Sequence, residues 1–187
     1  MAYYELKLGR PDCLDGREDK EIRCYDLLDS LQISYEQMDH PKADTMEVCL
    51  ELDKYLAPTI ICKNLFLCNR QKTDFYLLLI RHDKKFKTKE ISSQIGSARL
   101  SFADDAAMEE YLDIKPGAVS ILGLMNDHDN HVRLLIDEDL LKDDTIGVHP
   151  CVNTSVLRLK TEDLFQKFLP AVHHDYTTVY LVGEEAE

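Results

Sequence analysis

Several features of membrane and secreted proteins are missing from this 187-residue sequence. It has no apolar run near the roughly 18 residues that a membrane-spanning helix needs. The start, Met1 to Glu5, lacks the basic and apolar segments of a secretory signal. None of the six cysteines belongs to a Cys-x-x-Cys pair, so we interpret them as free thiols rather than disulfides or zinc ligands. We therefore expect a soluble, cytoplasmic protein with no membrane partner.

Familiar catalytic signatures are also missing. The sequence has no Gly-x-Ser-x-Gly elbow, no Walker loop, no Gly-x-Gly-x-x-Gly fingerprint and no His-Glu-x-x-His motif. Two histidine clusters, His128 with His131 and His173 with His174, lie among Asp and Asn residues that are typical of turns and connectors. We therefore expect neither a metal ion nor a cofactor.

Basic side chains are scarce, since 22 Lys and Arg face 35 Asp and Glu and the formal net charge is −13. Proteins bind nucleic-acid phosphates through Lys and Arg, so this balance argues against a general nucleic-acid binder, and we expect no DNA partner. The deficit is uneven, because residues 63–99 carry nine basic and three acidic side chains. This segment could guide an anionic partner to one face, or it could be a solvent-exposed hairpin with lysine-rich turns.

No repeat, low-complexity tract or Gly/Ser linker interrupts the chain, so we predict a single domain over residues 1–187. Helical spacing and capping residues predict helices at 18–31, from an N-cap at Thr45 through 56, at 88–95, at 104–112, and at 161–169 with Thr161 as the cap. Apolar runs predict strands at 33–38, 59–67, 75–81, 118–125, 132–137, 156–159 and 178–182. We expect two hairpins, one joining 59–67 to 75–81 and one joining 118–125 to 132–137. Interspersed helices and hairpins indicate an α/β or α+β fold with a mixed sheet.

Three segments combine structure with possible chemistry. In the first, Lys63 and Asn64 interrupt the apolar strand predicted at 59–67. Burying an unpaired ammonium group is costly, so Lys63 needs an anionic partner or a cleft. The alternative is a lysine at a strand end or edge whose ammonium group reaches water.

The second segment, 115–124, contains Gly117 and Gly123, which allow close backbone approach. Free N–H groups there could hold a carboxylate, a carbonyl or an oxyanion, although a tight turn into a core strand would need the same glycines. In the third segment, 147–154, Pro150 favours an extended His149, and Asn153 offers both a donor and an acceptor. This loop could line a pocket or could be a capping turn.

Five short motifs occur in an order that resembles the YbaK/prolyl-tRNA-synthetase-associated domain family, most of all its free-standing alanyl-tRNA(Pro) deacylases. The motifs are Cys62 to Leu67, Leu100 to Ala103, Pro116 to Ser120, Gly123 to Asp127, and His149 to Thr154. Each motif is weak alone, but five in order at compatible spacing are specific. The resemblance covers about residues 20–182 of the chain.

The resemblance implies a mixed, strongly curved β-sheet flanked by helices, and hydrolysis of misacylated tRNA, notably alanine on tRNA(Pro). It implies that Lys63 is the functional lysine of the family and that Asn64 lies beside it at the terminal adenosine. It also implies that a Gly-x-x-x-Pro loop contacts the aminoacyl ester through its backbone, and that His149 shapes the amino-acid pocket. The predicted catalytic residues are Lys63, Gly117 and Ala118, and the predicted substrate-binding residues are Asn64, Val119, Ser120, Ile121, Gly123, His149 and Asn153.

One position departs from the family pattern, because Ile121 occupies the place of the proline that usually ends the loop. Proline would fix the backbone and remove a donor, so Ile121 affects the expected rigidity and amino-acid preference. An aminoacyl ester is already reactive, and backbone donors with a positioned water could suffice without a triad or metal. The expected substrate is mischarged tRNA, with a prolyl-tRNA synthetase as a candidate partner. The alternative is a non-catalytic paralogue that binds aminoacyl-tRNA or an amino acid and regulates another protein.

Overall fold

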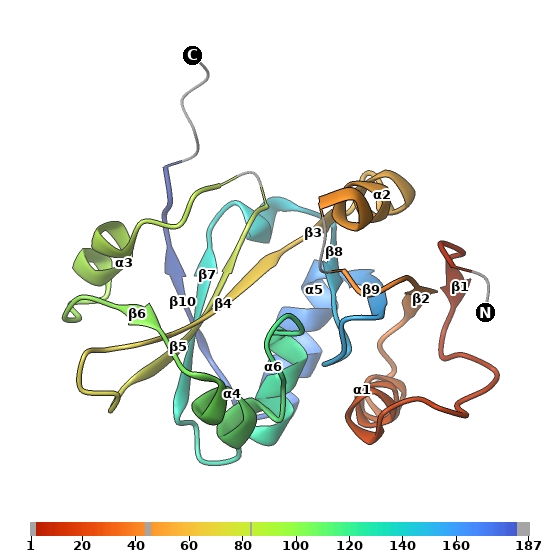
Figure 1. Cartoon of the computed structure of the whole chain (residues 1–187), viewed down its shortest axis with the longest axis horizontal. Coiled ribbons are helices and arrows are strands. Elements are labelled where there is room, and N and C mark those ends of the chain that lie inside the picture. Colours follow the sequence, from red (N-terminus) through yellow and green to blue (C-terminus); the bar gives the residue numbers. More distant parts are fainter. Residues whose placement is uncertain (1–2, 44–45, 83, 183–187) are drawn as a thin grey trace.

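The computed structural model describes residues 3–43, 46–82 and 84–182 of the chain (Figure 1). Its helices are α1 (Asp19–Ser30), α2 (Met46–Leu56), α3 (Thr88–Gln94), α4 (Asp105–Leu112), α5 (Thr161–Asp163) and α6 (Leu169–Ala171), with 3-10 turns at Ile121–Asn126 and Leu140–Lys142 and a π-helical turn, Leu164–Phe168, between α5 and α6. The helices predicted at 18–31, 88–95 and 104–112 are confirmed. The N-cap predicted at Thr45 lies outside the described residues.

The strands form two five-stranded sheets, and both contain parallel and antiparallel pairs. The first sheet has the order β1 (Lys7–Leu8), β2 (Tyr35–Asp39), β9 (Ser155–Lys160), β8 (Thr145–Val148) and β3 (Ile60–Ile61). The second has the order β10 (Tyr176–Val179), β7 (Val132–Asp137), β5 (Phe75–Ile80), β4 (Lys63–Cys68) and β6 (Ser101–Phe102). The predicted mixed α/β class is confirmed, whereas strong curvature of a single sheet is not.

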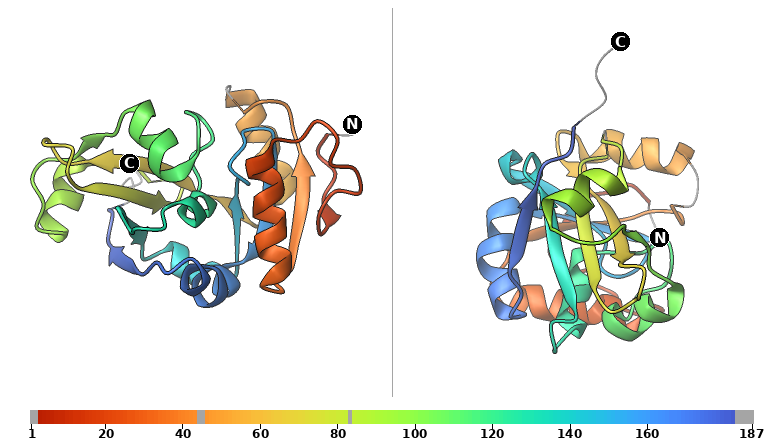
Figure 2. Two further views of the ribbon diagram at one scale, coloured as in Figure 1. Left: turned by 90° about the horizontal axis from the view of Figure 1, so that it is seen from below. Right: turned by 90° about the vertical axis from the view of Figure 1, so that its left-hand side faces the viewer.

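The main hydrophobic core lies between the two sheets. It includes Tyr25 and Leu28 of α1, Leu157 of β9, Leu77 of β5 and Phe168 of the π-helical turn, all fully buried. Apolar residues of α1 that recur every three or four positions therefore pack onto the first sheet, as their helical spacing predicts. Figure 2 (left) shows the two sheets side by side, with α1 on one half of the molecule.

Two smaller clusters cover the outer faces of the sheets. Leu52 and Leu56 of α2 pack with Met38 and Val156 of the first sheet. Ile91 of α3 packs with Leu67, Leu78, Leu135 and others of the second sheet. None of the helices in the described ranges is long and apolar enough to cross a bilayer.

The strand predicted at 118–125, and with it the second hairpin, is wrong. Ser120 accepts a hydrogen bond from the Leu122 N–H, and a 3-10 turn begins at Ile121 instead of a strand. A short apolar run does not distinguish a buried strand from a buried helical turn, which explains the error. The strand predicted at 132–137 is confirmed as β7, but its neighbours are the parallel strands β5 and β10.

Thr161 is not the helix cap that its position suggested. The cap residue is Lys160, and the hydroxyl of Thr161 is buried with no hydrogen-bond partner among the described residues. The strand β8 was not predicted, and its last two residues, Gly147 and Val148, were interpreted as the start of a loop.

Candidate active site

The first predicted motif lies where the chain passes from one sheet to the other. Ile61 of β3 pairs with Gly147 of β8 in the first sheet, and β4 begins two residues later in the second sheet. Cys62 stands between them, and its N–H donates to the Gly147 carbonyl at 3.4 Å. The strand predicted at 59–67 is thus two strands of different sheets. The interruption at Lys63 and Asn64 coincides with this crossing.

Neighbouring side chains of a strand point to opposite faces, so Lys63 and Asn64 diverge. Lys63 is exposed, and its ammonium donates to the backbone carbonyl of Lys84 at 3.2 Å. Asn64 is partly buried, and its amide nitrogen donates to the Cys62 carbonyl at 3.1 Å. The amide oxygen of Asn64 is buried and accepts no hydrogen bond from any described residue. Asn64 therefore has an acceptor available for a ligand, since buried polar atoms are normally paired.

A buried ion cluster fixes the carbonyl that Lys63 contacts. The Lys84 side chain is 7% exposed, and its ammonium lies 2.8 Å from Asp137 Oδ1 and 2.6 Å from Asp139 Oδ2. Burial works against the charge of Lys84, but the two carboxylates raise its pKa above the ordinary value. Sequence reasoning missed this cluster, which places Lys84 inside the fold although it belongs to the basic segment 63–99.

The loop 117–121 directs most of its side chains into the core. Ala118 is buried, and Ser120 and Ile121 are fully buried. Gly117 has a φ of +89°, which favours glycine, and it is exposed. The N–H of Ala118 donates to the Lys115 carbonyl at 3.1 Å, so this donor, predicted to be available to the substrate, is used inside the turn. The outer surface of the loop consists mainly of Gly117 and the half-buried Val119.

Two positions of the second segment are explained by packing. A Cβ added to Gly123 would lie 2.5 Å from Ile114 Cδ1 and 3.2 Å from Leu112 Cβ, so this glycine allows α4 and the 3-10 turn to approach closely. Ile121, which replaces the expected proline, has its side chain in the main core. Both residues are buried, so the structure places Gly123 and Ile121 in the packing behind the loop, and their assignment to substrate binding stays a prediction.

His149 follows β8 directly and is held by its backbone surroundings. Its Nδ1 lies 2.8 Å from the Ser155 carbonyl. Because a carbonyl only accepts, Nδ1 carries the proton and Nε2 of the neutral ring is an acceptor. Burial lowers the pKa of His149 to about 4, although one edge of the residue still reaches solvent. The ring of His40 lies 5.7 Å away, centroid to centroid. His149 is therefore neutral at physiological pH.

The three predicted segments approach one another between the sheets. The loops 117–121 and 149–154 lie side by side near the middle of the molecule in Figure 1 and Figure 2 (left). Cys62, Ala118 and Val148 belong to the same hydrophobic core. Asn153 is buried in the second loop, and its carbonyl accepts from the Ala43 N–H at 3.3 Å.

The histidine clusters are structural in part. His174 Nε2 lies 3.1 Å from Asp127 Oδ2, and Asp127 also accepts from the backbone N–H groups of His131 and Val132. Burial would lower the pKa of His174, but Asp127 raises it above the ordinary value. Among the described residues no group of three His, Cys, Asp or Glu side chains is arranged to hold a metal ion.

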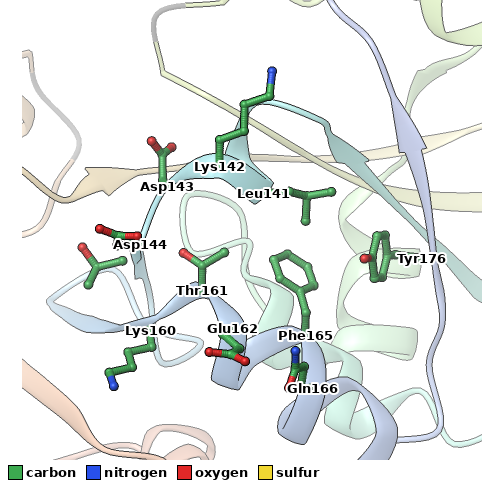
Figure 3. Close-up of a pocket in the computed structure, with 11 residues that line it drawn as sticks. Leu141, Lys142, Asp143, Asp144, Lys160, Thr161, Glu162, Phe165, Gln166 and Tyr176 are labelled. Carbon is green, nitrogen blue, oxygen red and sulfur yellow. The ribbon is translucent and has the colours of Figure 1, made fainter.

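A separate cavity of about 750 Å³ lies beside β10 and the start of β8. Figure 3 shows Phe165, Leu141 and Tyr176 on one side of it, and the rings of Phe165 and Tyr176 are 5.1 Å apart, centroid to centroid. Charged side chains of both signs complete the lining, among them Lys160 and Glu162. None of the predicted site residues belongs to its described lining, so this cavity is distinct from the candidate site.

Comparison with known proteins identifies the class. The sequence profile of the aminoacyl-tRNA editing domain matches residues 40–167. The prolyl-tRNA editing protein ProX of Acetoanaerobium sticklandii is 32% identical over 154 residues, which cover 82% of this chain and 93% of that protein. The prolyl-tRNA synthetase associated domain-containing protein 1 of Mus musculus is 32% identical over 79% of this chain and 88% of its own length.

A solved structure described as a putative trans-editing enzyme for prolyl tRNA synthetase has the same fold. It covers 90% of this chain and 99% of its own, with a TM-score of 0.66 and 15% identity. The chain therefore belongs to the aminoacyl-tRNA editing domain family, and the resemblance inferred from the five motifs is confirmed. The class of enzyme that this family defines is the aminoacyl-tRNA deacylases.

Proposed function

We propose that this protein hydrolyses mischarged tRNA(Pro) in trans, and alanyl-tRNA(Pro) above other substrates. The supporting observation is that Lys63 and Asn64 stand at the crossing between the sheets, within a chain that matches the editing family over residues 40–167. In the reaction, water attacks the ester carbonyl, and the bond between the carbonyl carbon and the ribose oxygen breaks. The products are the free amino acid and tRNA with an intact 3′ end.

Different residues of the site bind different parts of the substrate. Lys63, exposed and held at the Lys84 carbonyl, contacts the phosphate or ribose of the terminal adenosine. Asn64 uses its unpaired amide oxygen on the same nucleotide. The backbone of Gly117 and Val119 orients the ester carbonyl, while Ala118, Ser120 and Ile121 support the loop from the core. The neutral ring of His149, with Nε2 as an acceptor, borders the amino-acid pocket.

No acid–base triad is required by this proposal. The aminoacyl ester is activated, and a positioned water with backbone donors lowers the barrier through orientation and electrostatic stabilisation. The free hydroxyl of the terminal ribose assists by orienting the water. Because His149 is neutral and its Nδ1 donates to the Ser155 carbonyl, it is a pocket residue rather than the base.

The test is a panel of mischarged tRNAs incubated with the purified protein. We expect alanyl-tRNA(Pro) to be hydrolysed faster than prolyl-tRNA(Pro) and faster than alanyl-tRNA(Ala). Equal hydrolysis at the background rate across the panel would favour the second candidate, a non-catalytic paralogue that binds aminoacyl-tRNA or an amino acid. The net charge of −13 and the isoleucine at position 121 are the observations in favour of that candidate.

We also propose that the whole chain acts as one editing domain in the cytoplasm, and that a prolyl-tRNA synthetase cooperates with it. An acidic protein gains little affinity from nonspecific contacts with tRNA, so a partner that already holds tRNA(Pro) would raise the rate. Adding purified prolyl-tRNA synthetase to the deacylation assay at low tRNA concentration tests this. An unchanged rate would contradict the proposed cooperation.

A further inference from the structure

An exposed aromatic side chain lies on the outer edge of the second sheet. Phe102 of β6 is 65% exposed, and its ring lies 5.9 Å from that of Phe86, centroid to centroid, with 63° between the two planes. Phe86 is partly buried and packs against the cluster that includes Ile91 of α3 and Leu67 of β4. One ring is therefore anchored in the fold, while the other presents apolar surface to solvent.

The exposed ring lies on the same face of the sheet as Lys63. Phe102 pairs with Leu67 across the antiparallel β4–β6 ladder, and directly paired residues share a face. Lys63 and Leu67 are four residues apart on β4, so they also point to that face. At about 3.3 Å per residue this separation is about 13 Å along the strand. At the spacing of about 3.4 Å between successive phosphates of one strand, about four steps cover that length.

Positive charge accompanies the aromatic pair. Lys85 and Lys87 flank Phe86 in the sequence, and both are exposed. The ammonium of Lys87 lies 3.4 Å from Oε1 of Glu90. Both side chains are partly exposed, so a phosphate group could take the place of Glu90 beside Lys87. This part of the chain, residues 63–99, is the basic segment of an otherwise acidic protein. A polyanion is thus attracted to this edge and repelled by the remaining surface.

We propose that Phe102, supported by Phe86, is a stacking platform for an unpaired base of the tRNA 3′ end, upstream of the terminal adenosine at Lys63. This inference rests on the proposed function, because it assumes that the terminal adenosine lies at Lys63. Aromatic rings receive any base through its π-face, which suits a 3′ end shared by all tRNAs. Stacking on Phe102 would therefore increase the affinity for any tRNA, and other contacts would have to distinguish one tRNA from another.

A binding experiment tests the platform without catalysis. The probe is a short RNA ending in the tRNA 3′ sequence, with the fluorescent base 2-aminopurine placed at successive unpaired positions. We expect quenching at one position upstream of the terminal adenosine and a Kd about tenfold higher for Phe102→Ala, as the usual effect of removing a stacking ring predicts. Phe102→Trp should preserve both the quenching and the Kd.

The control is Tyr55→Ala, which removes another exposed aromatic ring (45%), on α2. Figure 1 shows α2 and β6 at opposite sides of the molecule. We expect this variant to bind the probe like the unmodified protein. Equal losses in the two variants, or none in Phe102→Ala, would overturn the platform.

Kinetics separate this inference from the proposed function. Phe102→Ala should raise KM for alanyl-tRNA(Pro) about tenfold with kcat within a factor of two, and should leave the hydrolysis of alanyl-adenosine unchanged. If the unmodified protein hydrolysed neither substrate, the proposed function would fail, while the fluorescence experiment would still decide whether Phe102 binds a base. If both substrates were hydrolysed and Phe102→Ala changed neither, the platform alone would be wrong.

Discussion

The ammonium group of Lys63 donates a hydrogen bond to the backbone carbonyl of Lys84, 3.2 Å away. The side chain of Lys84 is itself held between Asp137 and Asp139 at the carboxyl end of β7. The exposed lysine at the sheet crossing is therefore positioned by a second lysine that is buried. Of these two basic residues of the segment 63–99, Lys84 is buried in an ion cluster, and the exposed Lys63 is the one that we propose to contact the ligand.

Replacing Lys84 by methionine should lower the free energy of unfolding by about 3 kcal/mol, because Asp137 would remain buried without its cation. Denaturant unfolding followed by circular dichroism measures this. Lys85→Met, at the exposed neighbouring position, is the control and should change stability by less than about 0.5 kcal/mol. A Lys84→Met variant as stable as the control would show that the ion cluster contributes nothing.

Replacing Lys63 by alanine should reduce kcat/KM about 100-fold for both alanyl-tRNA(Pro) and alanyl-adenosine, as expected for the loss of a charged contact to the reacting nucleotide. The exposed side chain has little part in the core, so the melting temperature should not change. Lys63→Arg keeps the charge and should recover part of the rate. A defect confined to the tRNA substrate would instead place Lys63 on the acceptor stem.

Acidification should destabilise the protein through His149. Its pKa is about 4 in the folded state because of burial, whereas an unfolded histidine titrates near about 6.5. Between these values the unfolded state binds more protons, so stability is complete above about pH 6.5 and falls as the pH decreases towards 4. We expect a loss of about 3 kcal/mol across this window that is absent in His149→Gln.

His174 should change the stability in the opposite direction as the pH falls. The pKa of His174 is raised by Asp127, so its contribution is complete at low pH and is lost as the pH rises through the folded-state value. For this reason the measurement is the difference between the unmodified protein and His149→Gln, in urea unfolding at a series of pH values. Two parallel stability curves would mean that His149 takes up a proton in the folded state as readily as in the unfolded state.

Cysteine should be dispensable for turnover. Cys151 is the only cysteine in the third segment, and its sulfur is buried 3.6 Å from that of Cys24. Hydrogen bonding with Cys151, together with burial, raises the pKa of the Cys24 thiol, which disfavours the nucleophilic thiolate. We expect Cys151→Ser to retain kcat within about threefold and to lose about 1 kcal/mol of stability. Complete loss of turnover in a folded variant would require a thiol nucleophile.

Local patterns predicted the elements that depend on local spacing. The helical periodicity of Tyr25 and Leu28 gave α1, and the apolar runs 75–81 and 132–137 gave β5 and β7. Those runs did not reveal that β5 and β7 are parallel neighbours, because parallel pairing joins distant parts of the chain. The 3-10 turn after Ser120 was missed, because its buried apolar residues satisfy a strand pattern equally well.

In the candidate site, too, the sequence indicated the residues that stand out locally but not those that depend on distant contacts. Lys63 stood out in the sequence because it interrupts an apolar run, and His149 because it precedes Pro150 in a motif of the family. The residue that positions Lys63 did not, since Lys84 is indistinguishable from the exposed Lys85 until β7 brings Asp137 beneath it. A distant strand likewise explains why position 147 is a glycine. A Cβ added to Gly147 would lie 3.0 Å from Cγ1 of Ile61. Non-local contacts of this kind are fixed only by the fold.

Because the chain crosses from one sheet to the other at Cys62, hydrolysis should require both sheets to be folded. Lys63 begins a strand of one sheet, and His149 directly follows a strand of the other, while the pairing of Ile61 with Gly147 ties the two. Loss of either sheet would therefore separate Lys63, the proposed contact to the terminal nucleotide, from His149, the proposed border of the amino-acid pocket, even if the remaining sheet persisted. A partly unfolded chain would then have no residual hydrolysis, and the temperature at which turnover ceases would mark the less stable of the two sheets.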